Sequence, residues 1–166
     1  MSPQIYWMKG LWPGNLALSA RPRGGDWLDD EIKGWHREGV DEVLSLLTRD
    51  EEQDLDLTNE AKVASNEGIK FLSFPIPDRQ VPGSRAALTS TLEKVDADLS
   101  TGKNVLIHCR QGIGRTGLVA ACLLVSKGWD PASAIERISF LRGMPVPETD
   151  EQRRWIDGYA AVLAGK

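Results

Sequence analysis

One continuous stretch, VLIHCRQGIGRTGLVAACLLV from Val105 to Val125, restricts the fold of this chain more than any other segment. Its first residues are apolar and β-branched, as in a buried strand, and its last residues carry the apolar spacing of a helix. The loop between them holds Gly112, Gly114 and Gly117 and offers little side-chain volume for packing. A strand that turns into a helix through so short a loop is a building unit of α/β domains.

The rest of the chain alternates in the same way between strand-like and helix-like segments. Strands are predicted over 15–20, 40–47, 69–74 and 103–108, and helices over 26–39, 58–67, 84–102, 115–128, 130–143 and 149–163. N-cap signals stand at Asp26, Ser84 and Asp130, and at Thr48, which forms a capping box with Glu51. The pattern predicts an α/β fold with a central, mostly parallel sheet flanked by helices, and with the glycine-rich loop between a strand and a helix.

We expect one domain over residues 1–166, because the chain has no internal repeat, low-complexity tract or linker and its length suits a single core. The net charge is −4, so we expect no nucleic-acid partner and no general attraction to an anionic membrane. The first residues lack a basic region followed by an apolar run, and no apolar segment approaches the roughly 18 residues that span a bilayer. The two cysteines, Cys109 and Cys122, make no disulfide framework, so the cytoplasm is the expected location. The sequence carries no signal of oligomeric state.

The glycine-rich loop has the composition of an anion-binding turn. Backbone N–H groups of a tight turn converge on one point, and the N-terminus of the following helix adds further N–H groups and a partial positive charge. Glycine permits the positive φ angles and the close backbone approach that such a turn needs. The loop lacks the lysine of nucleotide-binding loops and does not match G-x-G-x-x-G, so no nucleotide site is predicted. The phosphate-binding residues predicted here are Arg110, Gln111, Gly112, Ile113, Gly114 and Arg115.

Cys109 is the first residue of this turn, and we expect its sulfur to face the converging N–H donors. Such a setting stabilises the thiolate, which is the nucleophilic form, over the thiol. Arg115 stands at the start of the helix, from where its planar guanidinium reaches the same anion with two parallel N–H groups. A nucleophilic thiolate beside an oxyanion-binding loop and an arginine suits phosphoryl transfer.

The order His108-Cys109-x5-Arg115-Thr116-Gly117 resembles the signature loop of the cysteine-dependent protein tyrosine phosphatase superfamily. The form HCRQGIGRTG is most similar to the small dual-specificity-type branch. The resemblance extends in order and length over roughly residues 15–160 and implies a central sheet flanked by helices, with no metal and no organic cofactor. It further implies that His108 hydrogen-bonds around the cysteine and helps to hold the loop. By the same resemblance, the hydroxyl of Thr116 lies near the sulfur and assists breakdown of a phosphocysteine intermediate.

Attack of a thiolate on a phosphate monoester expels an alkoxide or phenoxide, which needs a proton. A carboxylic acid is therefore expected on a loop near the cysteine. The segment FPIPDRQVPG follows a predicted strand, is too proline-rich for regular structure, and holds one carboxylate, Asp78. In the superfamily the acid lies on a loop at this place in the chain order. We therefore interpret Asp78 as the general acid, with a plain turn residue as the alternative.

For three further residues, Gln152, Arg110 and Arg21, the sequence allows two roles each. Gln152 fits a capping box with Thr149, and in many members of the superfamily a glutamine in a comparable segment positions the hydrolytic water. Arg110 is either a solvated loop residue or an extra cation at the pocket rim. Arg21 contacts substrate or covers a sheet edge and is left outside the predicted site. Cys122 lies on the apolar face of its helix and is assigned to the core.

These residues predict a phosphomonoester hydrolase that acts through a phosphocysteine on a phosphorylated protein or small phosphomonoester. The small size leaves little room for insertions that deepen a pocket, which favours phosphotyrosine together with phosphoserine or phosphothreonine. A phosphoinositide or inositol-phosphate phosphatase is the first alternative, although lipid-directed members often carry extra lysines in the loop, where this chain has Ile113 and one added cation, Arg110. A phosphate-binding pseudophosphatase is the second alternative, and intact Cys109, Arg115 and Asp78 argue against it.

Overall fold

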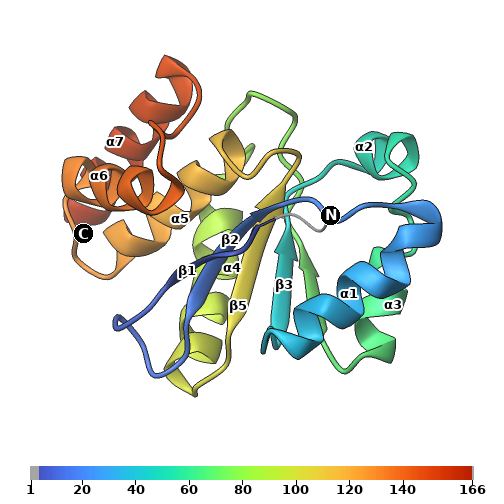
Figure 1. The fold of residues 1–166 in the computed structure, drawn as a ribbon. Helices are drawn as coiled ribbons and strands as arrows, with labels where there is room; N and C mark the ends of the chain where they lie inside the picture. Colours follow the sequence, from blue (N-terminus) through green and yellow to red (C-terminus); the bar gives the residue numbers. More distant parts are fainter. Residues whose placement is uncertain (1–3, 166) are drawn as a thin grey trace.

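The computed structural model describes residues 4–165 and contains one five-stranded sheet in the order β1-β2-β5-β3-β4. The strands β2, β5, β3 and β4 are parallel, and β1 adds to the edge of the sheet antiparallel to β2 (Figure 1). Their bounds are Tyr6–Met8 (β1), Leu16–Ala20 (β2), Glu42–Ser45 (β3), Lys70–Ser73 (β4) and Val105–Cys109 (β5). The prediction of a mostly parallel sheet is confirmed.

Helices cover both faces of the sheet (Figure 1). Their bounds are Leu28–Arg37 (α1), Arg49–Asp54 (α2), Glu60–Asn66 (α3), Arg85–Ser100 (α4), Gly114–Ser126 (α5), Pro131–Arg142 (α6) and Asp150–Ala164 (α7). Side chains of α1 and α3 form one buried cluster, and those of α4, α5, α6 and α7 form the other. The central strand β5 serves both clusters, because Leu106 enters the first and Ile107 the second, as alternation along a strand requires. None of the helices described has the length and apolar character of a bilayer-crossing segment.

Most of the predicted helix starts are confirmed by side-chain caps. Ser84 accepts a hydrogen bond at the start of α4, Asp130 does so at α6, and Thr48 forms a full capping box with Glu51. The N-cap predicted at Asp26 is wrong, because Asp26 lies inside a 3₁₀ turn over Gly25–Trp27 and α1 begins only at Leu28. The backbone before Asp26 is held against residues 55–56: the N–H of Gly25 donates to the carbonyl of Asp56 at 3.0 Å, and a Cβ on Gly24 would lie 2.0 Å from the carbonyl oxygen of Leu55.

The short edge strand β1 was not predicted from the sequence. It spans three residues, too few for a periodic signal, and it is held in place by pairing of Tyr6 with Leu18 and of Met8 with Leu16. The predicted strand over 40–47 is also longer than β3, which begins at Glu42 and ends at Ser45, although the N–H of Leu46 still donates to the carbonyl of His108 at 3.0 Å. Both differences come from pairing with distant segments rather than from local sequence.

The topology brings three loops to one end of the sheet. Because β5 lies between β2 and β3, and β3 pairs with β4, the carboxyl ends of these parallel strands are neighbours. The turn from β5 into α5, the segment from β3 into α2, and the loop that follows β4 therefore meet at that end (Figure 1). The carboxyl ends of parallel strands are where open α/β sheets bind their ligands.

Candidate active site

A pocket of about 250 Å³ opens at the carboxyl end of β5. It is lined by Asp78, Arg79, Cys109, Arg110, Gln111, Gly114, Arg115 and Glu148. The structure thus brings together the cysteine, both arginines and the aspartate that the sequence singled out. A larger hollow of about 840 Å³ lies between α4 and α7, and its lining includes none of these residues.

Cys109 ends β5 at the base of the pocket, with 3% of its surface exposed. The backbone N–H of Gly112 donates to its Sγ at 3.3 Å. Gly112 has φ +74°, and a Cβ there would lie 2.5 Å from the carbonyl oxygen of Ser19, so this position requires glycine. Because α5 starts at Gly114, its free N–H groups also point toward this end of the sheet. The surroundings of the sulfur are those of an anion site.

Arg115 is 1% exposed and makes four hydrogen bonds from its two terminal nitrogens. Nη1 donates to Glu51 Oε1 at 2.6 Å and to the carbonyl of Ile76 at 2.8 Å. Nη2 donates to Glu51 Oε2 at 2.9 Å and to Asp78 Oδ1 at 3.1 Å. A guanidinium has five N–H groups, so these four bonds leave Nε–H for a ligand. Arg115 can offer a phosphate a second N–H, parallel to Nε–H, only if Asp78 releases its hydrogen bond with Nη2.

Glu51 is a site residue that the sequence placed only in a capping box. Its carboxylate accepts from Arg115 through both oxygens and also from the backbone N–H of Thr48. Burial raises the pKa of Glu51, but the hydrogen bonds from Arg115 and Thr48 outweigh burial and hold that pKa below its usual value. For Arg115, burial lowers the pKa, whereas Glu51, Cys109 and Asp78 raise it above the ordinary value. The pair is therefore fixed as carboxylate and guanidinium.

Asp78 lies on the loop after β4, and about half (51%) of its side chain is exposed. Its neighbour Arg79 has a positive φ of 63° and pairs with Glu148 at 3.2 Å, on the other side of the pocket lining. This ion pair joins the loop after β4 to the segment before α7. Both carboxylates line the pocket, but only Asp78 contacts Arg115.

The other loop residues surround the cysteine in different ways. Arg110 is 44% exposed, and its Nη1 lies 3.9 Å from Glu51 Oε2, so it belongs to the rim. Gln111 lines the pocket, and Ile113 packs against the hydrophobic cluster of α4 to α7. Thr116 is fully buried, and its hydroxyl has no hydrogen-bond partner among residues 4–165. A hydroxyl without a protein partner is available to a ligand or an intermediate.

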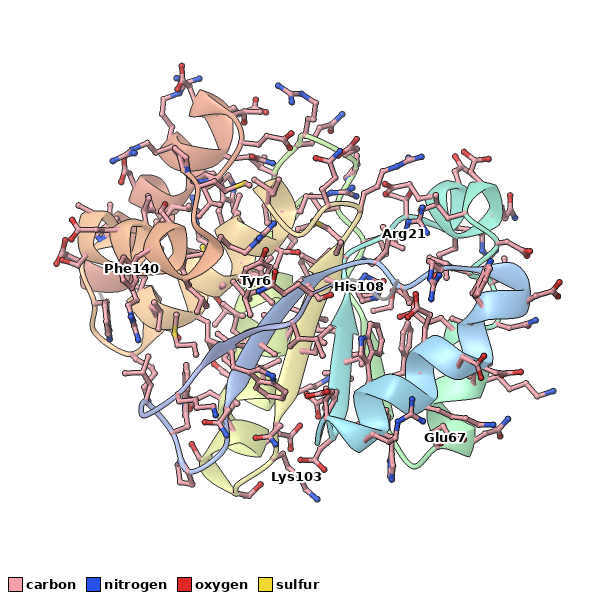
Figure 2. The ribbon with its side chains drawn as sticks, viewed as in Figure 1. Tyr6, Arg21, Glu67, Lys103, His108 and Phe140 are labelled. Carbon is pink, nitrogen blue, oxygen red and sulfur yellow. The ribbon has the colours of Figure 1, made fainter. Side chains whose placement is uncertain are left out.

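His108 is buried and its Nε2 lies 2.7 Å from Glu60 Oε2, with the ring of Trp35 also in contact. Successive residues of a strand face opposite sides, so His108 lies on the α1 and α3 side while Cys109 belongs to the other cluster (Figure 2). Its Nδ1 makes no hydrogen bond within the described part of the chain. Glu60 is a second buried acid that the sequence did not single out.

Gln152 is buried and acts as the predicted capping residue of α7. Its Oε1 accepts from the backbone N–H groups of Glu148 and Thr149, and its amide nitrogen donates to the carbonyl of Gln80 at 3.1 Å. Gln152 thus ties the loop that carries Asp78 to the start of α7, and it is not part of the pocket lining.

The residues assigned outside the site also lie outside the pocket lining. Cys122 is in the core, where burial raises the pKa of its thiol. Arg21 donates from Nη1 to the carbonyl of Pro22, and its backbone N–H donates to the carbonyl of Arg110. Within residues 4–165, no group of His, Cys, Asp and Glu side chains is arranged to hold a metal ion.

A family model described as "Polymorphic toxin system, DSP-PTPase phosphatase" matches residues 19–129. The cyclin-dependent kinase inhibitor 3 of Sus scrofa is 32% identical over 128 residues, which cover 76% of this chain. The chain spans about 60% of the length of that relative. Among solved structures, a kinase associated phosphatase with its catalytic-site cysteine changed to serine has a TM-score of 0.91 at 24% identity, covering 100% of this chain and 98% of that one. Tk-PTP in its active form has a TM-score of 0.79 at 28% identity, covering 97% and 99%.

Proposed function

The chain belongs to the DSP-PTPase phosphatase family, and from this premise we propose that it hydrolyses phosphate monoesters through a phosphocysteine intermediate. One observation carries the proposal. The sulfur of Cys109 accepts a backbone N–H from its own loop at 3.3 Å, in a pocket that also holds the guanidinium of Arg115 and the carboxyl group of Asp78. This combination supplies a nucleophile, an oxyanion site and an acid.

In the first step, the thiolate of Cys109 attacks phosphorus. A sulfur–phosphorus bond forms as the bond from phosphorus to the leaving oxygen breaks, and protonated Asp78 gives its proton to that oxygen. The loop N–H groups and Arg115 hold the remaining phosphate oxygens. Arg115 takes up the phosphate with Nε–H and with the Nη2–H that it otherwise donates to Asp78. Binding of the substrate therefore frees the acid at the moment when it is needed.

In the second step, Asp78 accepts a proton from water, whose oxygen attacks phosphorus and breaks the sulfur–phosphorus bond. The products are inorganic phosphate and the thiolate of Cys109. We assign to the buried hydroxyl of Thr116, which has no hydrogen-bond partner among the described residues, the stabilisation of the departing sulfur. Gln152 has both sides of its amide occupied by backbone groups, which favours positioning of the Asp78 loop over direct contact with water.

The charges at the rim favour a substrate with a single phosphate. Of the two cations at the pocket mouth, Arg79 is paired with Glu148, and Arg110 faces Glu51 at 3.9 Å. The carboxylates of Asp78 and Glu148 line the same small space and repel additional negative charge. We therefore propose phosphotyrosine, with phosphoserine or phosphothreonine, in a phosphorylated protein as the substrate. The exposure of Arg110 is the observation that supports a phosphoinositide or inositol phosphate as the alternative.

We also propose that residues 1–166 form one domain that works in the cytoplasm. Both hydrophobic clusters are built on a single sheet, and both cysteines are free thiols. Residues 1–3 and 166 of that domain lie outside the residues described.

A direct test is release of phosphate from a side-by-side panel of phosphotyrosine, phosphoserine and phosphothreonine peptides and of phosphoinositides. The Cys109→Ser variant is the control for a contaminating phosphatase. We expect turnover of phosphotyrosine peptides above all others and none with Cys109→Ser. Exclusive turnover of the phosphoinositides would replace the proposed substrate class, and no turnover of any phosphomonoester would overturn the proposed function.

A further inference from the structure

We propose that Arg142, held in place by Tyr6, is a positioning residue for the catalytic loop. This inference rests on the proposed function of the loop, but it concerns residues that the phosphatase chemistry itself does not use. Arg142 is the last residue of α6 and Tyr6 is the first residue of β1. Both lie outside the segment 19–129 that matches the family model.

Arg142 donates hydrogen bonds to two carbonyl groups of the loop. It is buried, and its Nε donates to the carbonyl oxygen of Gly112 at 2.8 Å while its Nη2 donates to that of Gln111 at 3.3 Å. These are consecutive carbonyl groups of the turn that surrounds Cys109. Arg142 does not line the pocket, so it acts on a bound phosphate only through the loop.

Because a peptide unit is planar, a hydrogen bond that fixes its carbonyl group also fixes its N–H group, and one such N–H group of the loop faces the sulfur. In a trans peptide the C=O of one residue and the N–H of the next point in opposite directions. The carbonyl of Gln111 points to Arg142, and the N–H of the same peptide unit, on Gly112, donates to Cys109 Sγ at 3.3 Å. The carbonyl of Gly112 points to Arg142 in the same way, so the N–H of Ile113 is turned toward the opposite side. Arg142 thus fixes the carbonyl ends of two successive peptide units, the first of which presents its N–H to Cys109.

A loop of this kind needs such an anchor. Gly112 has a positive φ of 74°, and glycine allows the neighbouring peptide units to rotate at little steric cost. Rotation of the unit between Gln111 and Gly112 replaces an N–H donor at the sulfur with a carbonyl oxygen, which repels both a thiolate and a phosphate. Two hydrogen bonds from a cation to the carbonyl side oppose that rotation.

Tyr6 holds the guanidinium in this orientation. The guanidinium carbon of Arg142 lies 4.2 Å from the centre of the Tyr6 ring, in the range of a cation–π contact. Tyr6 is fixed by its pairing with Leu18 across the edge of the sheet, and β1 lies against α6 (Figure 2). The edge strand β1 thereby contributes to the site, because its Tyr6 orients Arg142 and Arg142 holds the loop.

The test compares Arg142→Gln, Arg142→Lys and Tyr6→Leu with Arg137→Gln, which removes the same charge from the same helix. Two readouts need no turnover: binding of inorganic phosphate by calorimetry, and the rate at which iodoacetate alkylates Cys109. Both are measured well below the melting temperature, so a change in stability alone does not alter them. For Arg142→Gln we expect about tenfold weaker phosphate binding and a similarly slower alkylation, as for loss of charge-assisted hydrogen bonds.

Arg142→Lys should fall between that variant and the wild type, because lysine keeps the charge without the planar pair of donors. Tyr6→Leu should weaken phosphate binding by about two- to fivefold, and Tyr6→Phe, which keeps the ring, should restore it. Arg137→Gln should resemble the wild type. If Arg142→Gln does not fold, Arg142→Lys and Tyr6→Leu decide by the same readouts.

Phosphate binding and alkylation at wild-type levels in the folded Arg142 variants would overturn the inference, as would an equal loss in Arg137→Gln. The outcome is separate from that of the proposed function. If the wild type hydrolyses no phosphomonoester but these two readouts still fall in Arg142→Gln, the proposed function fails and the positioning role stands.

Discussion

Glu51 holds the guanidinium of Arg115 through both carboxylate oxygens, at 2.6 and 2.9 Å, and both residues are buried. The two residues lie in different helices, and the contact fixes one of the two loop arginines that line the pocket. An arginine that is already oriented loses little freedom when phosphate binds, and such preorganisation is the main source of electrostatic catalysis.

Replacing Glu51 should therefore damage both stability and activity. Removing one partner of a buried ion pair costs roughly 3–5 kcal/mol, because the other charge remains buried without compensation. We expect Glu51→Gln to lower the free energy of unfolding toward that range and to reduce kcat/KM. Denaturant unfolding and steady-state kinetics measure the two effects. Asp50→Asn, an exposed neighbour on α2, is the matched control, and an equal loss in that variant would argue against the ion pair as the cause.

The two arginines of the loop should respond very differently to mutation. Arg115→Lys should be severely impaired, since an ammonium group cannot keep the paired bonds to Glu51 and also present two parallel N–H groups to phosphate. Arg110→Ala should mainly change the preference among substrates, because Arg110 is exposed at the rim. Kinetics on a singly and a doubly phosphorylated peptide separate the two. Equal losses on both peptides from both changes would mean that the roles are assigned wrongly.

The environment of Cys109 predicts selective alkylation. Iodoacetate should modify Cys109 far faster than Cys122, because Cys122 is in the core and burial raises the pKa of its thiol. Phosphate or vanadate should protect Cys109, and Cys109→Ser should still bind phosphate because the loop donors remain. Mass spectrometry of the modified peptides gives both rates. An alkylation rate at Cys109 that phosphate leaves unchanged would contradict the anion site.

The sequence allowed the glycine-rich loop, its flanking strand and helix, and most helix caps to be predicted, because these features are local. Cys109, the proposed nucleophile, and Arg115 lie six residues apart, and N-caps such as Ser84 need only the residues that follow them. The partners Glu51, Glu60 and Arg142 were missed because each meets the loop only through the fold. A signal for Glu51 did exist: it follows the strand beside β5, and a buried arginine needs a carboxylate. With 24 acidic residues in the chain, that signal alone does not select one.

At the opposite end of β3, Glu42 predicts a pH dependence of stability. Burial, together with the hydrogen bond and repulsion from Asp98, raises the pKa of Glu42 to about 8, and Lys70 offsets only part of this. A carboxyl group whose pKa is raised on folding stabilises the protein fully below its unfolded pKa of about 4.5. That stabilisation is lost as the pH rises through about 8.

Glu42→Gln cannot ionise, so it should be more stable than the wild type at pH 8 to 9 and much closer to it near pH 5. The difference should grow by at most about 1.4 kcal/mol per pH unit between these limits. The lowered pKa of Asp98 acts in a separate window, below about pH 4, where stability falls as that carboxylate is protonated. Unfolding curves from pH 5 to 9 check the prediction, and parallel pH profiles for both proteins would contradict it.

Asp78 is best tested through the leaving group and through its contact with Arg115. Protonation in the transition state matters most for a strongly basic leaving oxygen, and loss of a general acid typically costs about 10²–10⁴-fold in rate. Asp78→Ala should therefore strongly lower the rate of hydrolysis of alkyl phosphates and phosphotyrosine, and should lower that of an activated aryl ester much less. The variant should also bind inorganic phosphate more tightly than the wild type, because Asp78 no longer occupies an N–H of Arg115 or repels the anion. Measurement of kcat/KM across aryl phosphates of graded leaving-group pKa, with calorimetry of phosphate binding, tests both expectations. An unchanged dependence on the leaving group would move the acid to another pocket carboxylate, with Glu148, which lines the same space, as the next candidate.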